Sequence, residues 1–346
     1  MEDSKEIKLK NKIFITLMIV AIFFVLSGGS IEYKEIIDLS VMQNFSTIFI
    51  SIVLEAMPFI MLGAFISALM QEFISEQFIK KIIPRNKFLG FLGAALMGII
   101  FPVCECAIVP ITKRLMKKGV PVGIAVTFML AVPIVNPIVL MSTYYAFYDR
   151  PSMVLIRGGF GLLVAIIIGV LIDYSEKGNP PPIKQDSYES DYKCYCGCDY
   201  ETGSSYNHSK LKGVLEHTSK ELLAISKYLI FGAVISSIYQ VTVSNQFTAA
   251  IGNHQYYSIL TMMALAFILS ICSEADAFIA RTFLGQFTTG SVAAFLILGP
   301  MIDIKNTLML SGNFKLRIVI KLIVYITAIT FSVGCFINVL EMMGVI

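Results

Sequence analysis

Residues 88–119 read FLGFLGAALMGIIFPVCECAIVPITKRLMKKG, an apolar run that ends in a short basic loop. The loop before it, 71–87, is also basic. Because basic loops concentrate on the cytoplasmic side of a membrane, a run that crosses the bilayer should not have one at each end. Pro102 and Pro110 interrupt the run, and residues 88–101 as a helix reach only about 21 Å, less than the roughly 30 Å of a hydrocarbon core. The run therefore predicts a re-entrant hairpin that enters and leaves on the cytoplasmic side; the alternative is a kinked full span.

The composition of the chain is typical of a membrane protein. Of its 346 residues, 56% are apolar and 15% are charged, and the mean hydropathy is +0.76. Soluble domains carry about a quarter charged residues, so a soluble enzyme, a disordered protein and a nucleic-acid binder are excluded. The net charge of +3 is too small to indicate a polyanionic partner, and seven cysteines do not suggest a disulfide framework. We predict an all-α polytopic integral membrane protein that has the lipid bilayer, and no nucleic acid, as a partner.

Apolar segments of sufficient length predict about 7–9 membrane helices. Residues 13–29 follow a Lys-rich start, and the absence of a clear cleavage site favours an uncleaved helix over a signal peptide. The chain divides into an N-terminal membrane helix with an external loop (1–40), a first membrane repeat (41–173), a polar linker (174–212) and a second membrane repeat (213–346). The basic residues of the short loops place the N-terminus and the linker on the cytoplasmic side of the plasma membrane.

The two membrane repeats resemble each other at a nearly fixed offset of 167–169 residues. The corresponding segments are 62–71 and 231–240, 104–107 (CECA) and 272–275 (CSEA), and 132–136 (VPIVN) and 299–303 (GPMID). If each repeat has three crossings and one hairpin, the second repeat is inverted relative to the first. The loop 241–255, then external, has no Lys or Arg, whereas 312–317, then internal, has both. Inverted repeats with broken helices are typical of secondary transporters.

Thiol and carboxylate side chains at the two hairpins are the first candidates for substrate or ion binding. They are Cys104, Glu105, Cys106, Cys272 and Glu274. Thiolates select soft species such as Cu(I), Zn(II) or trivalent arsenic, so the three cysteines are also candidate metal ligands. A carboxylate inside a membrane is costly and marks a transport pathway or a proton relay.

Asn136 and Asp303 are further candidates for binding, because each follows a proline at a predicted helix break. Their alternative role is to satisfy backbone groups that the break leaves free. Arg157 and Lys305 are expected to reach an interface with their charged ends. Cys335, single in the last helix, is expected to be a structural residue.

Cys194, Cys196 and Cys198 lie together in the polar linker. Three thiols within five residues can hold one soft ion, but they do not complete a four-ligand zinc site. Thiols stay reduced on the cytoplasmic side. We expect a metal-capture or sensing loop; the alternative is a variable linker whose cysteines have no role.

Three motifs resemble those of a known bacterial family. Residues 101–110 (FPVCECAIVP), 113–121 (KRLMKKGVP) and 131–137 (AVPIVNP) resemble the predicted-permease family that includes the organoarsenical efflux permease ArsP and the YraQ-type permeases. The resemblance covers nearly the whole chain beyond the first helix. It implies a plasma-membrane permease that exports trivalent organoarsenicals or soft divalent metals, and it suggests a small partner subunit.

The resemblance also assigns residues. The Cys-x-Cys motif of the family carries over to Cys104 and Cys106, and its Asn-Pro motif to Asn136 and Pro137. Glu105 stands where small residues are common in relatives, which favours a cationic or proton-coupled substrate over neutral methylarsenite.

The leading hypothesis is a permease that exports a thiophilic metal ion, a metalloid or an organoarsenical species. Because the sequence has no Gly-x-x-x-x-Gly-Lys-Ser/Thr loop for nucleotides, an ion gradient is the expected energy source. The alternatives are an integral-membrane thiol oxidoreductase, since close cysteine pairs exchange disulfides, and a membrane subunit that anchors a partner protein. For the leading hypothesis we expect no enzymatic activity and no cofactor.

Overall fold

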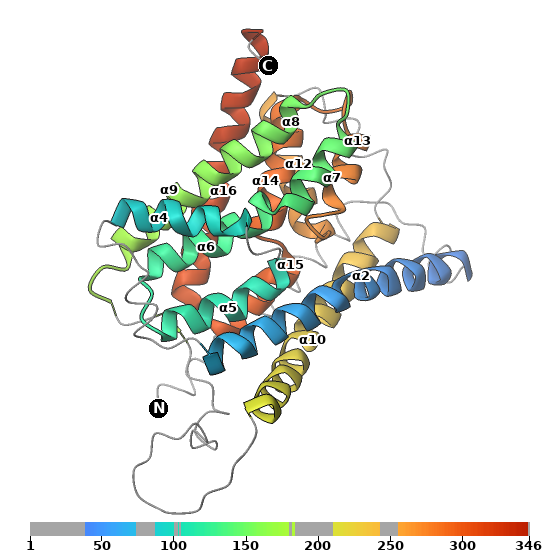
Figure 1. Ribbon diagram of the computed structural model, residues 1–346. Coiled ribbons are helices and arrows are strands. Elements are labelled where there is room, and N and C mark those ends of the chain that lie inside the picture. The colour runs from blue at the N-terminus through green and yellow to red at the C-terminus, as the bar shows by residue number, and fades with distance from the viewer. Residues whose placement is uncertain are drawn as a thin grey trace, which may run out of the picture.

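The computed structural model describes residues 39–73, 87–99, 103, 105–179, 182–183, 210–242 and 255–344. These residues form helices and no strand (Figure 1), so the protein is an all-α membrane protein as predicted. The N-terminal run 13–29 and most of the linker lie outside the described residues. So do four of the candidate cysteines, Cys104, Cys194, Cys196 and Cys198.

The helices follow one another in the same order in the two repeats. The first contains α2 (Leu39–Phe73), α4 (Lys87–Leu96) with the short 3-10 turn η1 (Met97–Ile99), α5 (Glu105–Lys117), α6 (Val122–Val135), α7 (Pro137–Ala146), α8 (Ser152–Leu155), the π-helical turn η2 (Ile156–Phe160) and α9 (Gly161–Ser175). The second contains α10 (Lys210–Thr242), α12 (Gln255–Leu269), α13 (Asp276–Thr282), α14 (Thr289–Met301), α15 (Ile304–Asn313) and α16 (Leu316–Met342).

Four helical stretches in the described ranges are long and apolar enough to cross a membrane. They are Val122–Ala146, Ser152–Ser175, Thr289–Asn313 and Leu316–Met342. Three other apolar helices are shorter: Lys87–Ile99, Leu229–Ile238 and Tyr256–Leu269. At 1.5 Å per residue, the first and last of these reach only about 20 Å, less than the roughly 30 Å of a hydrocarbon core. Each is followed by another short helix, α5 or α13, and we call these two pairs, α4 with α5 and α12 with α13, the first and the second hairpin; the re-entrant path expected for 88–111 stays a prediction.

Each repeat is built on the same close crossing of two helices. In the first, α6 and α9 approach at Gly123 and Gly169: a Cβ on Gly123 would lie 2.5 Å from the Gly169 carbonyl oxygen. In the second, α14 and α16 approach at Gly290 and Gly334, where a Cβ on Gly290 would lie 2.1 Å from the Gly334 carbonyl oxygen. Small residues allow such contact between membrane helices. In the first repeat α4 packs on both α6 and α9, and in the second repeat α12 packs on both α14 and α16.

The first hairpin, α4 and α5, opens at the end of the molecule where α9 ends and α16 begins. An ion pair between Glu176 and Arg317 joins these two helix ends. Lys87, the first residue of α4, lies 2.8 Å from Asp173 near the end of α9. Lys113 in α5 donates to Asn313 at 3.3 Å, and Asn313 is the last residue before the turn into α16. Both arms of the hairpin therefore reach this end of α16.

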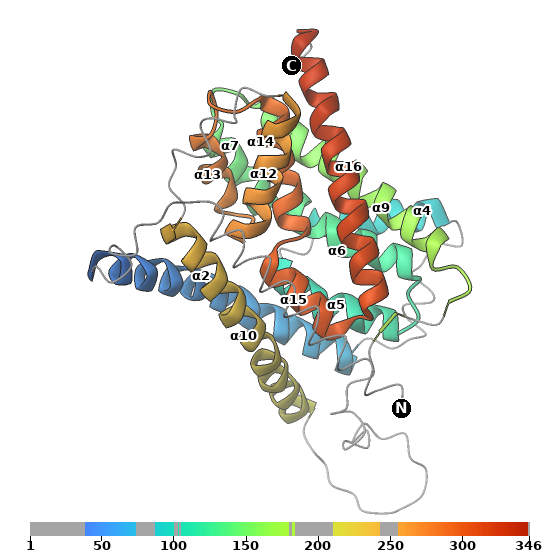
Figure 2. The ribbon, with the colours of Figure 1, turned by 180° about the vertical axis from the view of Figure 1, so that it is seen from behind.

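The second hairpin, α12 and α13, opens at the other end of α16. Near the start of α12, the Ser258 hydroxyl lies 2.6 Å from that of Ser291 in the first turn of α14, and a short connection joins α13 to α14. Thr289, the first residue of α14, donates to Glu341 at the far end of α16. Because the 27 residues of α16 extend about 40 Å, the two hairpins open at opposite ends of the molecule, as inverted repeats require. Figure 1 and Figure 2 show α5 and α15 at one end, with α7 and α13 at the other.

Candidate functional site

The tips of the two hairpins meet inside the molecule. Glu105 is the first residue of α5, and Ser273 lies in the break before α13. The Ser273 hydroxyl donates to Glu105 Oε2 at 3.1 Å, and both residues are buried. They are counterparts in the two repeats, so their contact lies at the pseudo-two-fold axis between the halves.

A cavity of about 240 Å³ adjoins this contact. Its walls come from α2, the end of α10, both hairpin tips and the start of α15. Five lining residues carry groups that bind or neutralise ions: Glu55, Glu105, Cys106, Cys272 and Lys305. Two carboxylates, two thiols and an ammonium group thus face one space that is large enough for a small ion or molecule.

Glu105 has a buried oxygen with unused hydrogen-bonding capacity. Its Oε1 has no hydrogen-bond partner, although the side chain is 1% exposed. The N-terminus of α5, where Glu105 lies, favours a negative charge but offsets only part of the cost of burying a carboxylate. A buried oxygen of this kind, beside a cavity, attracts a cation or a proton.

Asn136 and Asp303 each begin the helix that follows a break. Asn136 Oδ1 accepts a hydrogen bond from the Ile138 amide at 3.0 Å, and Asp303 Oδ1 accepts one from the Asn306 amide at 2.5 Å. Both residues therefore satisfy backbone groups at the break, the alternative role predicted from the sequence. Asn136 lies outside the cavity lining, whereas Asp303 contacts a residue of the lining, Lys305.

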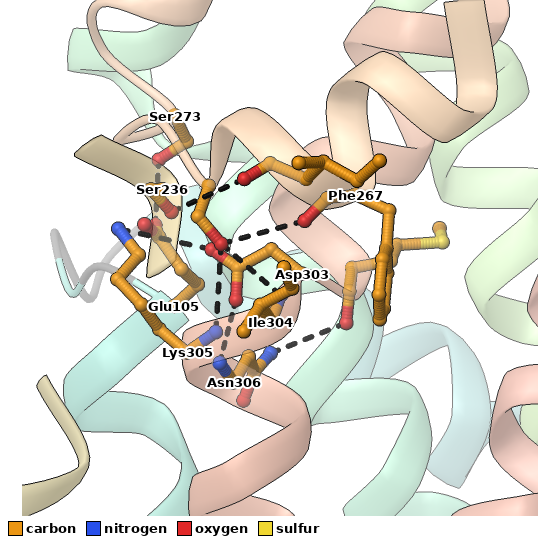
Figure 3. A network of polar contacts seen from close by, with 11 residues as sticks. Glu105, Ser236, Phe267, Ser273, Asp303, Ile304, Lys305 and Asn306 are labelled. Atoms are coloured by element: carbon orange, nitrogen blue, oxygen red, sulfur yellow. Dashed lines mark hydrogen bonds and ion pairs between the residues drawn. The ribbon is translucent and has the colours of Figure 1, made fainter. Parts of the chain in front are cut away.

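Lys305 is buried, so the expectation that it reaches an interface is wrong. It is 3% exposed, and its Nζ lies 3.7 Å from Asp303 Oδ2, which accepts no hydrogen bond. Figure 3 shows the side chains of Glu105, Lys305 and Asp303 directed toward one another. Ser270, at φ 50°, fixes the start of α15, because its Oγ accepts hydrogen bonds from the backbone amides of Ile304 and Lys305.

Arg157 is also buried, and the same expectation is wrong for it. The side chain is fully buried and donates to Asp276 Oδ2 at 2.7 Å, to Thr143 Oγ1 at 2.8 Å and to the Ser273 carbonyl at 3.0 Å. Because it comes from the first repeat and holds the tip of the second hairpin, it ties the two repeats together. Ser273 in turn contacts Glu105, so this ion pair also positions the candidate site.

Arg281 pairs with a residue outside the membrane-spanning helices. Its guanidinium donates to both carboxylate oxygens of Asp149, at 2.5 and 3.0 Å, and lies over the ring of Phe147. The hydrogen bonds from Arg281 hold the pKa of Asp149 below its usual range. This exposed pair joins the second hairpin to the turn after α7.

The predicted soft-metal ligands are partly assembled. Cys106 and Cys272 line the cavity, Cys335 lies in α16 away from it, and Glu274 is half-buried outside the lining. Within the described part of the chain, no three His, Cys, Asp or Glu residues are close enough together to hold a metal ion. Glu105, Cys106 and Cys272 therefore line one cavity but are not gathered closely enough to hold a metal ion together.

Lys305 was not among the site residues predicted from the sequence, although the sequence contains an indication of its role. It is a single cation two residues after Asp303, at a position where the first repeat has the apolar residue Ile138. A charge that breaks the similarity of two repeats, beside a helix break, indicates a function that only one repeat supplies.

The chain is similar to membrane permeases over most of its length. The model of a family described as predicted permease (ArsP_1) matches residues 41–339. The chain belongs to this permease family. The UPF0718 protein YcgR of Bacillus subtilis is 47% identical over 83% of this chain and 94% of its own length. A putative two-component membrane permease complex subunit of Streptococcus mutans is 39% identical over 80% of this chain and 89% of its own length.

A more distant similarity links the chain to the YraQ-type proteins. The UPF0718 protein YraQ of Escherichia coli is 24% identical over about a third of each chain. No solved structure matches the chain significantly. The family indicates a multi-pass membrane transporter rather than an enzyme, as the motifs at 101–110 and 131–137 predict.

Proposed function

We propose that this permease exports a thiophilic metal ion, or a metalloid or organoarsenical species, through the cavity between the hairpin tips. One observation carries the proposal: the buried Glu105, with an unpartnered oxygen, lies on a cavity that the thiols of Cys106 and Cys272 also line. Thiols select soft species, and the carboxylate supplies the charge that a cation needs. Cys104, beside Glu105 in the sequence, would add a third thiol.

The inverted architecture supports transport by alternating access. Hairpins that enter from opposite ends and meet at their tips place the cavity between two halves, either of which can open. We assign the end with Lys87, Lys113 and Arg317 to the cytoplasm because it is rich in basic residues. The N-terminus and the linker then lie on the cytoplasmic side. An ion gradient supplies the energy, with Glu105 exchanging a proton for the substrate.

A partner protein belongs to the same proposal. The similar Streptococcus mutans protein is named as a subunit of a two-component membrane permease complex, and this chain would act with a second component in the same way. The linker cysteines Cys194, Cys196 and Cys198 would capture the soft ion on the cytoplasmic side and deliver it to the cavity.

Uptake into everted membrane vesicles tests the proposal, because uptake there reports export from the cell. Zinc, copper, cadmium, arsenite and methylarsenite are compared as substrates. We expect at least one of them to accumulate, and Cys106→Ser and Glu105→Gln each to reduce the rate at least tenfold. Cys335→Ser is the matched control, since this thiol lies away from the cavity, and it should transport like the wild type.

Equal transport of every substrate by all four proteins would show that the cavity is not the transport site. A mixed disulfide trapped at Cys106, without transport, would instead favour the thiol oxidoreductase. Unchanged metal tolerance in cells that carry Glu105→Gln would favour a membrane anchor for a partner.

A further inference from the structure

Lys305 is the one buried cation among the described residues that line the cavity. Its Nζ lies 3.7 Å from Asp303 Oδ2, beyond hydrogen-bonding distance, and close enough to Glu105 for the two charges to interact. Two oxygens of the carboxylates that interact with it, Asp303 Oδ2 and Glu105 Oε1, have no hydrogen-bond partner. The ammonium group has three donors, and none of them makes a hydrogen bond to either oxygen.

The charges around Lys305 do not balance. Asp276 is neutralised by Arg157, which leaves Glu105 and Asp303 against the single charge of Lys305. Taken as ionised, these three buried groups sum to −1. If the ammonium group moved away, the Glu105 carboxylate and the thiols of Cys106 and Cys272 would line the cavity, and Asp303 behind it would lose its counter-charge. This arrangement attracts a thiophilic divalent cation.

The side chain of Lys305 is packed closely at its base, whereas its ammonium group has only the 3.7 Å ion pair with Asp303 among the described residues. Gly232 of α10 packs directly on the stem: a Cβ there would lie 2.4 Å from Lys305 Cγ and 3.0 Å from its Cα. The ammonium end borders the cavity. A second acceptor borders it too, because Glu55 of α2 lines the same cavity and its charge interacts with that of Lys305.

We propose that Lys305 is a built-in counter-ion: its ammonium group takes the place of the cargo in the empty cavity and moves to Glu55 when a thiophilic divalent cation binds beside Glu105 and the two thiols. This proposal rests on the proposed function, because it takes the cavity to be the cargo site. It names the cargo as a divalent cation rather than a neutral arsenical. It also explains how an empty transporter keeps two carboxylates buried, since an unpaired charge is costly in a membrane.

Direct binding of Cd²⁺ to the purified full-length protein tests the proposal independently of transport. Lys305→Gln removes the competing charge, and we expect its Kd for Cd²⁺ to fall at least tenfold relative to the wild type. The Kd for methylarsenite, which is neutral and does not compete with an ammonium group, should stay within twofold. Lys321→Gln is the matched control, because Lys321 pairs with Glu176 outside the cavity lining, and both affinities should stay unchanged.

Lys305→Arg keeps the charge and so tests the proposal even if Lys305→Gln does not fold. The planar guanidinium can hold a carboxylate with two hydrogen bonds. We therefore expect it to compete with Cd²⁺ for the carboxylates better than the ammonium group does, and to weaken Cd²⁺ binding at least threefold. Unchanged or tighter Cd²⁺ binding by Lys305→Arg would overturn the proposal, as would no tightening by a folded Lys305→Gln protein or no Cd²⁺ binding by the wild type. Binding as expected without any transport in vesicles would overturn only the proposed function.

Discussion

Replacing Arg157 by methionine is expected to reduce the yield of folded protein in the membrane at least tenfold. The substitution leaves Asp276 as a buried carboxylate without its cation, and it removes the donors to Thr143 and the Ser273 carbonyl. Breaking a buried ion pair by removing one partner costs about 3–5 kcal/mol. Size-exclusion chromatography of a fluorescent fusion, extracted in mild detergent, measures the folded fraction.

Two controls separate the buried charge from the loss of contacts in general. Arg157→Met combined with Asp276→Leu removes both charges, so it should recover most of the yield that the single substitution loses. Arg281→Met breaks an ion pair with similar hydrogen bonds, but at an exposed site, so its yield should stay near that of the wild type. If Arg157→Met and Arg281→Met behave alike, the buried pair does not tie the repeats together.

Replacing Gly290 by valine is expected to prevent folding of the second repeat. A Cβ at this position would lie 2.1 Å from the Gly334 carbonyl oxygen and 2.4 Å from Asn338 Oδ1, so α14 and α16 must move apart. Asn338 Oδ1 also accepts a hydrogen bond from the Gly290 amide, and that bond would be lost. We expect the thermal transition of the purified protein to fall by more than 10 °C, or no folded protein at all.

The inverted repeat supplies a second test site and a matched control for this prediction. Gly123→Val in α6 should have a similar effect, because Gly123 holds the equivalent position against α9. Gly93→Val in α4 is the control: nothing lies within 4 Å of a Cβ at Gly93, so only the lower helix propensity of valine remains. A Gly290→Val protein as stable as Gly93→Val would show that the close crossing does not hold the repeats together.

The fold was predictable because membrane constraints act over long segments. Basic residues at both ends of 88–111, with Pro102 inside it, favoured a hairpin over a kinked full span, and an odd number of crossings would then invert the second repeat. The similarity of 104–107 to 272–275 identified Glu105 and Ser273 as equivalent positions, and these two residues are in contact in the structure. The glycine crossings were missed, although Gly123 and Gly290 are spaced at the same offset as the other repeat matches.

The site was predicted in part. Glu105, Cys106 and Cys272 were named from their residue types and the helix break, and all three line the cavity. Lys305 and Arg157 were misplaced, because a sequence does not show whether a charged side chain in an apolar segment has a partner far along the chain. The partner of Arg157 is 119 residues away, and Glu105, whose charge interacts with that of Lys305, comes from the other repeat.

Labelling from the two sides of the membrane tests the inverted arrangement most directly. Lys117 ends α5 and Gln286 lies between α13 and α14, so each marks the exit of one hairpin, and both are exposed. Single cysteines at these positions, in a chain whose native cysteines are replaced by serine, are treated with an impermeant maleimide. In intact cells the reagent should label Gln286→Cys, and it should label Lys117→Cys only after the membrane is permeabilised. Labelling of both positions from the same side would contradict the inverted repeats and the cavity between them.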